Sequence, residues 1–494
     1  MPGPDIQAGC FSGLFSFFAT GNARSRRSTA ADMSKLELSS GRGAVELPAD
    51  FSNLNCHHCD WHGMPVSPPT SEIPPAYTLR DAEDVFRPEV IKTIEETVDE
   101  LNPELRELNL EIWNHPEIAY EEKRAHDVLT KFMSQHGFDV TPHYLDLSTA
   151  WRAVFKHTSS STKNGDAIRV IGVNSEMDAL PGIGHACGHN LIAIAGVGAA
   201  LAVKAALEKH DVSGKIVLLG TPAEESGGGK VKLLDRGAYD EMDACIMCHP
   251  SPGPLHSVSV GPCLACQTIE VEFFGHTAHA AWAPWEAQNA LDAAFLAYTN
   301  ISVLRQQIKP THRVHGIVSG KNWAANIIPD YSKMVWIVRA PTWPEVEVLR
   351  ERVLKCFEAA ATATGCKAEI NQEVGYYDLR QNSVLGDEFS HIMDARYGVK
   401  SLADGGMGAS TDFGNITYAL PALHPSFTIP TEPNGSNHTP QFTQSAGTPA
   451  AHAAAIAVTK GLAGAAFRVL DDAEFTDRVK KAFKHDQEAN VVRA

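Results

Sequence analysis

The chain has 494 residues, of which 42 are basic and 59 acidic, so its formal net charge is −17. That acid excess makes nucleic acid an unfavourable partner, because phosphate backbones would be repelled. The longest apolar run, at 191–203, is shorter than the eighteen or so residues that a membrane span needs. Ten cysteines are too few for a disulfide scaffold of this length. We therefore expect a protein of a reducing, cytoplasmic setting without transmembrane helices.

Residues 1–80 are rich in Ser, Pro and Gly and lack periodicity, which predicts an irregular or flexible N-terminal extension. The chain does not open with the basic and then apolar pattern of a secretory signal. The aromatic and basic residues at 11–29 leave a targeting element as an alternative. The stretch NCHHCDWH at 55–62 resembles half of a zinc knuckle, but no second pair of ligands lies nearby.

From residue 88 onward, helical and strand patterns alternate. Apolar spacing is helical over 88–137, with Pro103 and Pro116 as interruptions, and Asn190 is expected to cap a buried helix that runs to about 208. The remaining elements expected in this part are strands at 150–155, 167–173, 215–220 and 243–248 and a helix near 229–237. This alternation predicts an α/β fold, a mixed sheet flanked by helices, with functional side chains at the carboxyl ends of strands.

A different order occupies 265–378. Strands are expected at 267–275, 313–320, 332–340 and 367–375, and helices at 284–306 and 344–363. The resulting order, β-α-β-β-α-β, is that of a ferredoxin-like α+β module. Gly-rich loops and an Ala-rich helix at 447–466 follow it. We therefore expect this module to be inserted into a larger domain made of 81–264 and 379–494.

The stretch SEMDALPGIGHACGHN, residues 175–190, gathers acids, histidines and a thiol. Cys187 and His189 are separated by one residue in a Gly-flanked loop. A thiolate with an imidazole suits zinc or another borderline divalent ion. A buried cysteine beside a helix N-terminus is the alternative for this pair.

Two adjacent acids, Glu224 and Glu225, follow a predicted strand and precede three glycines. Like charges side by side are costly unless a cation or a proton lies between them. In a hydrolytic site, one carboxylate can bind the metal while its neighbour moves a proton from water to the leaving nitrogen. His249 ends another predicted strand and His438 lies in a polar loop. Together these motifs indicate a metal-dependent hydrolase.

A rival metal assignment uses four other thiols. Cys245, Cys248, Cys263 and Cys266 have the CxxC-x14-CxxC spacing of a zinc ribbon. Against it, the first two lie in an apolar strand without the glycines of a zinc knuckle, so these thiols could equally be small core side chains.

With these motifs the chain resembles dinuclear metallopeptidases of the aminoacylase and carboxypeptidase type, in the amidohydrolase branch that carries HACGH. Within it the chain is most similar to the β-alanyl-lysine and Xaa-Arg dipeptidase group, and also to aminobenzoyl-glutamate hydrolase subunits and auxin-conjugate amidohydrolases. The resemblance runs from WNHPEIAYEE at 113 to the last Ala-rich helix, through PAEESGGG, GHTAHAAWAPWEAQNALDA, NIIP, GASTDFGN and HTPQF. Auxin-conjugate enzymes usually have an acid and a histidine where this chain has Asn190 and Ile192.

The resemblance implies two divalent metal ions, zinc first and manganese or cobalt as alternatives. It implies that Glu224 is the general base and acid and that Asp178 orients a ligand imidazole. From the inserted domain, a lid and dimerisation domain, His279 would stabilise the oxyanion, and Asn326 would contact it or the substrate carboxylate. The implied metal ligands are Cys187, His189, Glu225, His249 and His438.

The expected reaction is hydrolysis of an amide bond in a dipeptide or N-acyl amino acid, by a homodimer. A non-catalytic metal-binding subunit and a specialised biosynthetic amidohydrolase acting on a bulky conjugate are the alternatives. Trp282, Trp285 and Trp323 are candidates either for the substrate pocket or for the core or dimer interface of the inserted domain.

Overall fold

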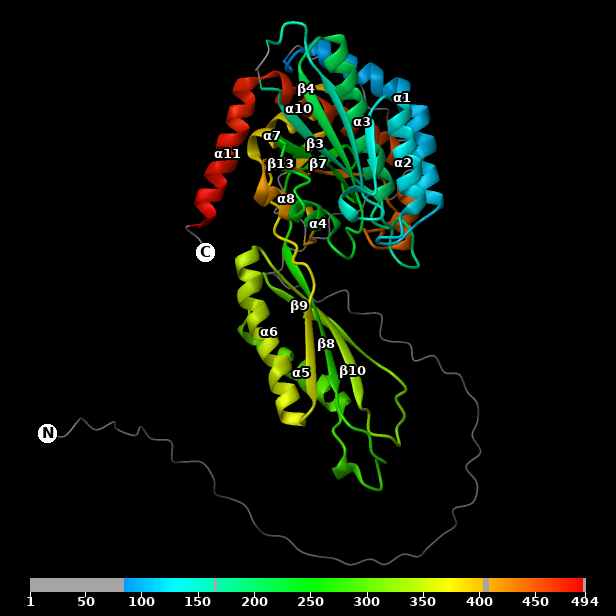
Figure 1. Ribbon diagram of the computed structural model, residues 1–494, viewed down its shortest axis with the longest axis vertical. Coiled ribbons are helices and arrows are strands. Elements are labelled where there is room, and N and C mark those ends of the chain that lie inside the picture. Colours follow the sequence, from blue (N-terminus) through cyan, green and yellow to red (C-terminus); the bar gives the residue numbers. More distant parts are fainter. Residues whose placement is uncertain (1–83, 164–166, 403–407, 492–494) are drawn as a thin grey trace, which may run out of the picture. The chain divides into compact units, whose positions relative to one another are not determined.

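The structure, a computed structural model, describes residues 84–163, 167–402 and 408–491 (Figure 1). The predicted N-terminal extension, the stretch at 55–62 and the segment at 11–29 lie outside these residues. The largest sheet has six strands in the order β1-β2-β4-β3-β5-β13. Their bounds are β1 Asp139–Pro142, β2 Trp151–His157, β3 Val170–Glu176, β4 Gly214–Thr221, β5 Ala244–Ile246 and β13 Ala422–Leu423.

This sheet is mixed, as predicted. Strands β4, β3, β5 and β13 are parallel neighbours, and β2 and β1 pair antiparallel at one edge. A second, smaller sheet has the order β12-β7-β14-β6. Its strands are β6 His249–Ser251, β7 Ser257–Ser259, β12 Lys400–Leu402 and β14 Ser426–Thr428.

Helices cover both faces of the six-stranded sheet, and further helices pack on these. They are α1 Pro88–Asn114, α2 Lys123–Gln135, α3 His189–Lys209, α4 Gly229–Asp235, α7 Ser383–Tyr397, α8 Phe413–Ala419, α9 Pro440–Ala446, α10 Pro449–Asp471 and α11 Ala473–Val491. Alternate residues of β4 serve the two faces, since side chains of a strand point to opposite sides. Ile216 and Leu218 join the core built with α1, α3 and α10, whereas Val217 and Leu219 join the core that contains residues of α4 and α8.

Two of these helices, α3 and α10, are long and apolar enough to cross a membrane by length and composition alone. In both, 89% of the most apolar window is buried within the protein. Small residues allow this burial: a side chain at Gly196 of α3 would come within 2.8 Å of the Asn174 carbonyl oxygen on β3. We therefore assign both helices to the core, as a helix that is apolar all round is expected to be buried.

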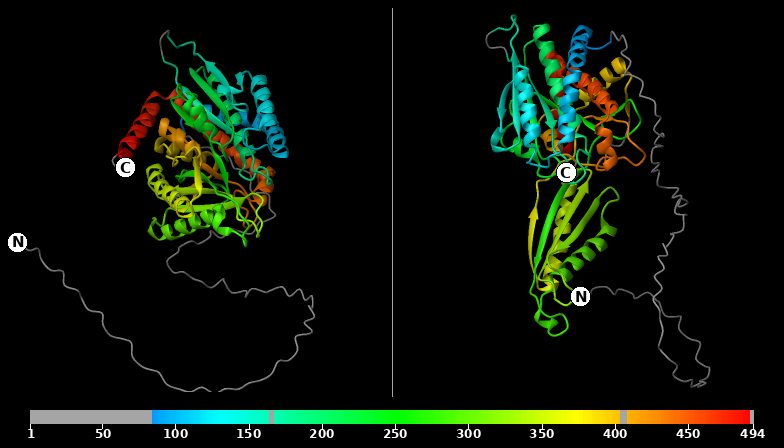
Figure 2. Two further views of the ribbon diagram at one scale, coloured as in Figure 1. Left: turned by 60° about the horizontal axis from the view of Figure 1, so that its bottom comes forward. Right: turned by 90° about the vertical axis from the view of Figure 1, so that its right-hand side faces the viewer.

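The inserted module has the predicted order. Its elements are β8 Ala265–Phe274, α5 Ala290–Leu304, β9 Arg313–Gly320, β10 Tyr331–Ala340, α6 Trp343–Thr364 and β11 Lys367–Gln372. The strands form an antiparallel sheet in the order β11-β8-β10-β9. Both helices pack on one face of it (Figure 2). The core of this domain contains the buried residues Trp336 and Phe357. This is the ferredoxin-like arrangement.

Three local predictions are wrong. Helix α1 continues through Pro103, because buried residues on both sides, including Val98 and Leu105, hold it in the core. Asn190 does not cap α3: Gly188 is the N-cap, and the Asn190 amide is buried and donates to Asn109 Oδ1 at 2.6 Å. The helix predicted from 284 is a short 3-10 turn at Pro284–Glu286 followed by α5 from Ala290.

Candidate metal centre

The predicted metal ligands converge from four separate places in the fold. Cys187 and His189 lie just before and at the start of α3, Glu225 lies in the loop after β4, His249 begins β6, and His438 lies just before α9. Since several strands of the sheet are parallel, the loops that leave them meet at one edge.

Two groups of donor atoms share the Cys187 sulfur. The first joins Cys187 to His189 and His249, and the second joins Cys187 to Glu225 and His438, with the donor atoms of each group within 4.8 Å of one another. The Cys187 sulfur lies 3.2 Å from His249 Nε2, and His438 Nε2 lies 3.3 Å from Glu225 Oε1. All five predicted ligands therefore belong to one cluster.

Hydrogen bonds orient the two buried imidazoles. His189 Nδ1 lies 3.0 Å from Asp178 Oδ1, which directs Nε2 towards the other donors. His249 Nδ1 donates to the Pro250 carbonyl at 2.8 Å, which leaves its Nε2 facing Cys187. Orientation of a ligand imidazole by a carboxylate or carbonyl on its far nitrogen is typical of metal sites. Asp178 is therefore placed to orient the His189 imidazole.

The loop of His438 is tied to the other ligand loops. The His438 amide donates to the Ala186 carbonyl at 2.9 Å, and Asn437 Nδ2 donates to the Pro250 carbonyl at 3.1 Å. His438 itself has a left-handed backbone, with φ of 67°. That conformation costs a residue with a side chain about 1 kcal/mol, so these bonds maintain it.

The donor set fits a divalent metal. His189 Nε2 and Glu225 Oε1 are buried and make no hydrogen bond within the described part of the chain. An unsatisfied buried polar atom is costly, and a cation would satisfy both. Thiolate, imidazole and carboxylate together are the ligands of zinc and related ions.

Burial and neighbouring charges shift the pKa values of three side chains in this cluster. Burial, followed by the charges of Glu176, Glu225 and Asp412, raises the pKa of Glu224 well above its usual range. Burial and the charge of Glu225 likewise raise the pKa of the Cys187 thiol. Burial alone would lower the pKa of His189, but Glu176 and Asp178 outweigh it and raise that pKa. Burial and the neighbouring carboxylates therefore favour the neutral form of the Glu224 carboxyl group.

Three charged residues that the sequence analysis missed lie beside this cluster. Lys230 Nζ is 2.6 Å from both Glu176 Oε1 and Asp412 Oδ1, and all three side chains are fully buried. Glu176 Oε2 in turn lies 3.3 Å from His189 Nε2. Glu176 lies in the motif SEMD and Asp412 in GASTDFGN, so the sequence analysis quoted both motifs. Nothing in the sequence around Lys230, which follows three glycines, indicated a role for it.

The loop that carries the two glutamates is anchored from the start of α2. Glu122 is buried and its Oε1 accepts from the Ala223 amide at 2.9 Å, and the Tyr120 hydroxyl donates to the Gly227 carbonyl at 2.8 Å. Ala223 is left-handed, with φ of 59°. The residue before Glu224 is therefore held in a strained conformation by a buried carboxylate.

The two predicted site residues of the inserted domain are neighbours of each other. The Ala280 amide donates to the Asn326 carbonyl at 3.0 Å, and His279 pairs with Ile327 in an isolated bridge. Neither belongs to a metal-binding group among the described residues. Trp282 and Trp285, 81% and 78% exposed, do not lie in the core of this domain, so a core role is wrong for both. Their roles in the substrate pocket or in a dimer interface stay predictions.

The rival zinc ribbon is not formed. Cys245 and Cys263 belong to the core on one face of the large sheet and Cys248 to the core on the other, and no metal-binding group in the described residues contains them. Burial raises the pKa of the Cys245, Cys248 and Cys266 thiols, as expected of small core side chains.

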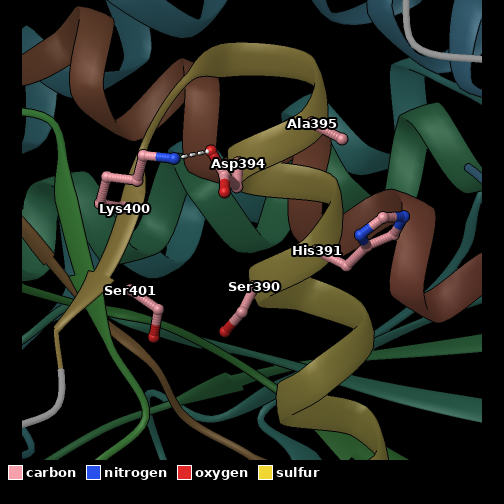
Figure 3. A pocket seen from close by; sticks show the side chains of 6 residues that line it. All are labelled: Ser390, His391, Asp394, Ala395, Lys400 and Ser401. Carbon is pink, nitrogen blue, oxygen red and sulfur yellow. Dashed lines mark hydrogen bonds and ion pairs between the residues drawn. The ribbon is translucent and has the colours of Figure 1, made fainter. Parts of the chain in front are cut away.

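A surface pocket of about 540 Å³ lies elsewhere, between α7 and β12 (Figure 3). Its charged residues, Asp394 and Lys400, pair with each other at 2.6 Å. It contains none of the predicted site residues and no metal-binding group of the described chain. The chemistry therefore points to the cysteine, histidine and glutamate cluster.

Known peptidases resemble this chain in sequence and in fold. Peptidase family M20/M25/M40 matches residues 172–463. The Xaa-Arg dipeptidase of Mus musculus is 42% identical over 400 residues, which cover 79% of this chain and 91% of that protein, and the Homo sapiens enzyme is 40% identical over 402 residues with the same coverage. A dinuclear metal-binding M20 peptidase from Bacillus subtilis shares the fold, with a TM-score of 0.57 and 18% identity over 75% of this chain and 99% of its own. The resemblance drawn from the motifs is confirmed, and the chain is a hydrolase that belongs to the M20/M25/M40 peptidase family.

Proposed function

We propose that this protein is a dipeptidase that hydrolyses the amide bond of dipeptides with a basic C-terminal residue, and that it also accepts N-acyl amino acids. The observation that carries the proposal is the shared Cys187 sulfur between two groups of donors, with Glu224 beside them. The names of the Mus musculus and Homo sapiens relatives support the substrate class.

Two divalent ions, zinc first and manganese or cobalt as alternatives, would be held by Cys187, His189, Glu225, His249 and His438. When bound, such ions supply Lewis acidity that activates water as a nucleophile and polarises the amide carbonyl. Because burial raises the pKa of the Cys187 thiol, metal binding must displace its proton. Metal affinity is therefore expected to increase with pH.

In this mechanism Glu224 takes a proton from the attacking water and delivers it to the leaving nitrogen. Its Oε2 lies 3.9 Å from His189 Nε2, close to the ligands but not hydrogen-bonded to that imidazole. Burial and the neighbouring carboxylates raise its pKa, which makes its carboxylate a stronger base than that of an exposed glutamate. Asp178 holds His189 in place.

We propose that residues 265–378 act as a lid and dimerisation domain, in which His279 stabilises the oxyanion and Asn326 contacts it or the substrate carboxylate. Homodimer formation through this domain is supported by its exposed apolar residues. Phe295 and Val303 on α5 and Ile317 on β9 are 60%, 70% and 66% exposed. Strand β9 also lies at an edge of its sheet, where unpaired backbone groups can join another strand.

A cytoplasmic location is supported by the free thiols of all the described cysteines.

The test begins with metal analysis of the purified protein. A panel of dipeptides and N-acyl amino acids is then assayed with zinc, manganese or cobalt. The Glu224→Gln variant should retain both ions and lose about 10²- to 10⁴-fold in turnover. The neighbouring Glu225→Gln variant is the matched control, and it should lose metal as well as activity. Full activity of Glu224→Gln would reject the mechanism.

A further inference from the structure

The peptide unit that joins Glu224 to Glu225 is hydrogen-bonded at both ends. Its carbonyl oxygen, that of Glu224, accepts from the Tyr376 hydroxyl at 2.8 Å. Its amide, that of Glu225, donates to Asp178 Oδ2 at 3.0 Å. Because a peptide unit is planar and rigid, bonds at these two ends fix how both glutamate side chains leave the backbone.

The Tyr376 hydroxyl makes a second bond to the same loop. It accepts from the Gly228 amide at 3.0 Å, on the residue that precedes α4. A single oxygen atom thus joins the carbonyl of Glu224 to an amide four residues later. The hydroxyl oxygen therefore bridges the two ends of the loop 224–228.

Tyr376 lies in the connection between the inserted sheet and the larger domain. It follows β11, which ends at Gln372, and precedes α7, which begins at Ser383. Its amide and carbonyl pair with the carbonyl and amide of Cys266, both at 2.8 Å, and Cys266 is the second residue of β8. The two chain segments that enter and leave the inserted sheet therefore meet at the residue whose side chain contacts the loop.

We infer that Tyr376 is a positioning residue for Glu224: its hydroxyl orients the peptide unit that carries the proton-transfer carboxylate and links that unit to the base of the inserted domain. This inference rests on the proposed function, since it assumes that Glu224 moves the proton. Asp178 acts on the amide side of the same unit, so it holds both the ligand His189 and the neighbour of Glu224.

The test is Tyr376→Phe in the full-length, metal-loaded protein, because this change removes one oxygen atom and keeps the ring. We expect kcat to fall by about ten- to hundredfold, since a small misplacement of a reacting group can cost about 10²-fold. KM should stay within about twofold, because substrate contacts are unchanged. Metal content per chain should equal that of the unaltered protein.

Tyr377→Phe is the matched control. Tyr377 is the next residue of the same connection, and its ring stacks on Trp343 with centroids 4.6 Å apart. That variant should keep its kcat. Hydrogen exchange adds a direct readout: the amides of Gly228 and Glu225 should exchange faster in Tyr376→Phe than in Tyr377→Phe.

Three results would overturn the inference. They are a kcat equal to that of Tyr377→Phe, a loss of kcat that equals the loss of folded, metal-loaded protein, and a rise in KM alone. The Glu224→Gln variant separates this failure from that of the proposed function. If Glu224→Gln is inactive and Tyr376→Phe is unimpaired, only the role of Tyr376 is rejected, whereas an active Glu224→Gln rejects the proposed mechanism itself.

Discussion

Replacement of Lys230 by Met should destabilise the protein strongly. The lysine ammonium lies 2.6 Å from the carboxylates of Glu176 and Asp412, and none of the three side chains is exposed. Lys230, Glu176 and Asp412 together have a formal charge of −1. The two carboxylates without the lysine have a formal charge of −2. Removing one partner of a buried ion pair typically costs about 3–5 kcal/mol.

The loss of stability in Lys230→Met should depend on pH. Burial raises the pKa of Asp412 to about 6 despite the attraction of Lys230, and loss of the ammonium would raise it further. A carboxyl group with a raised pKa in the folded state holds its proton there while the unfolded chain has released it. Stability therefore falls as pH rises through this range, so the destabilisation in Lys230→Met should be greater at pH 8 than at pH 6.

The assay is urea unfolding at a fixed excess of metal ion. With an m value of about 3 kcal/mol/M, a loss of about 4 kcal/mol lowers the midpoint by about 1.3 M. The control is Lys230→Met with Asp412→Asn, which restores the formal charge of the trio to −1. The asparagine oxygen can still accept from the Lys230 backbone amide, as Asp412 Oδ2 does at 2.9 Å. The reasoning is refuted if the single variant keeps its midpoint, or if the double variant is less stable than the single one.

Two further predictions concern the same loop and a distant histidine. In Gly229→Ala, the new Cβ would lie 1.8 Å from the Pro222 carbonyl oxygen, so the backbone of the glutamate loop must move. We expect a loss of about 3 kcal/mol and of most metal and activity, and an unchanged metal content would contradict this. Burial lowers the pKa of His452 to about 4, so its contribution to stability is present above about pH 6.5 and is lost as pH falls towards 4. Across that range, the free energy of unfolding of His452→Gln, measured by urea titration, should decline by up to about 3 kcal/mol less than that of the unaltered protein. An equal decline in both proteins would reject the assignment.

Local patterns were sufficient for much of the fold. The short apolar run at 215–220 predicted the strand β4, and the order of elements between Ala265 and Gln372 predicted the ferredoxin-like module. The predicted helix cap at Asn190 is wrong, because the side-chain amide of Asn190 donates to a distant residue, Asn109, at 2.6 Å and Gly188 is the N-cap. Long-range partners of this kind override local preference.

The sequence by itself determined the chemistry of the site: a cysteine, histidines and paired acids at the ends of predicted strands, in motifs specific to one family of hydrolases. Only the tertiary structure decided how those groups are held. Lys230 joins Glu176 to Asp412, and Tyr376 joins a domain connection to Glu224, across separations of up to 182 residues. Sequence patterns report local periodicity and chemical type, whereas such contacts depend on which buried surfaces the chain brings together when it folds.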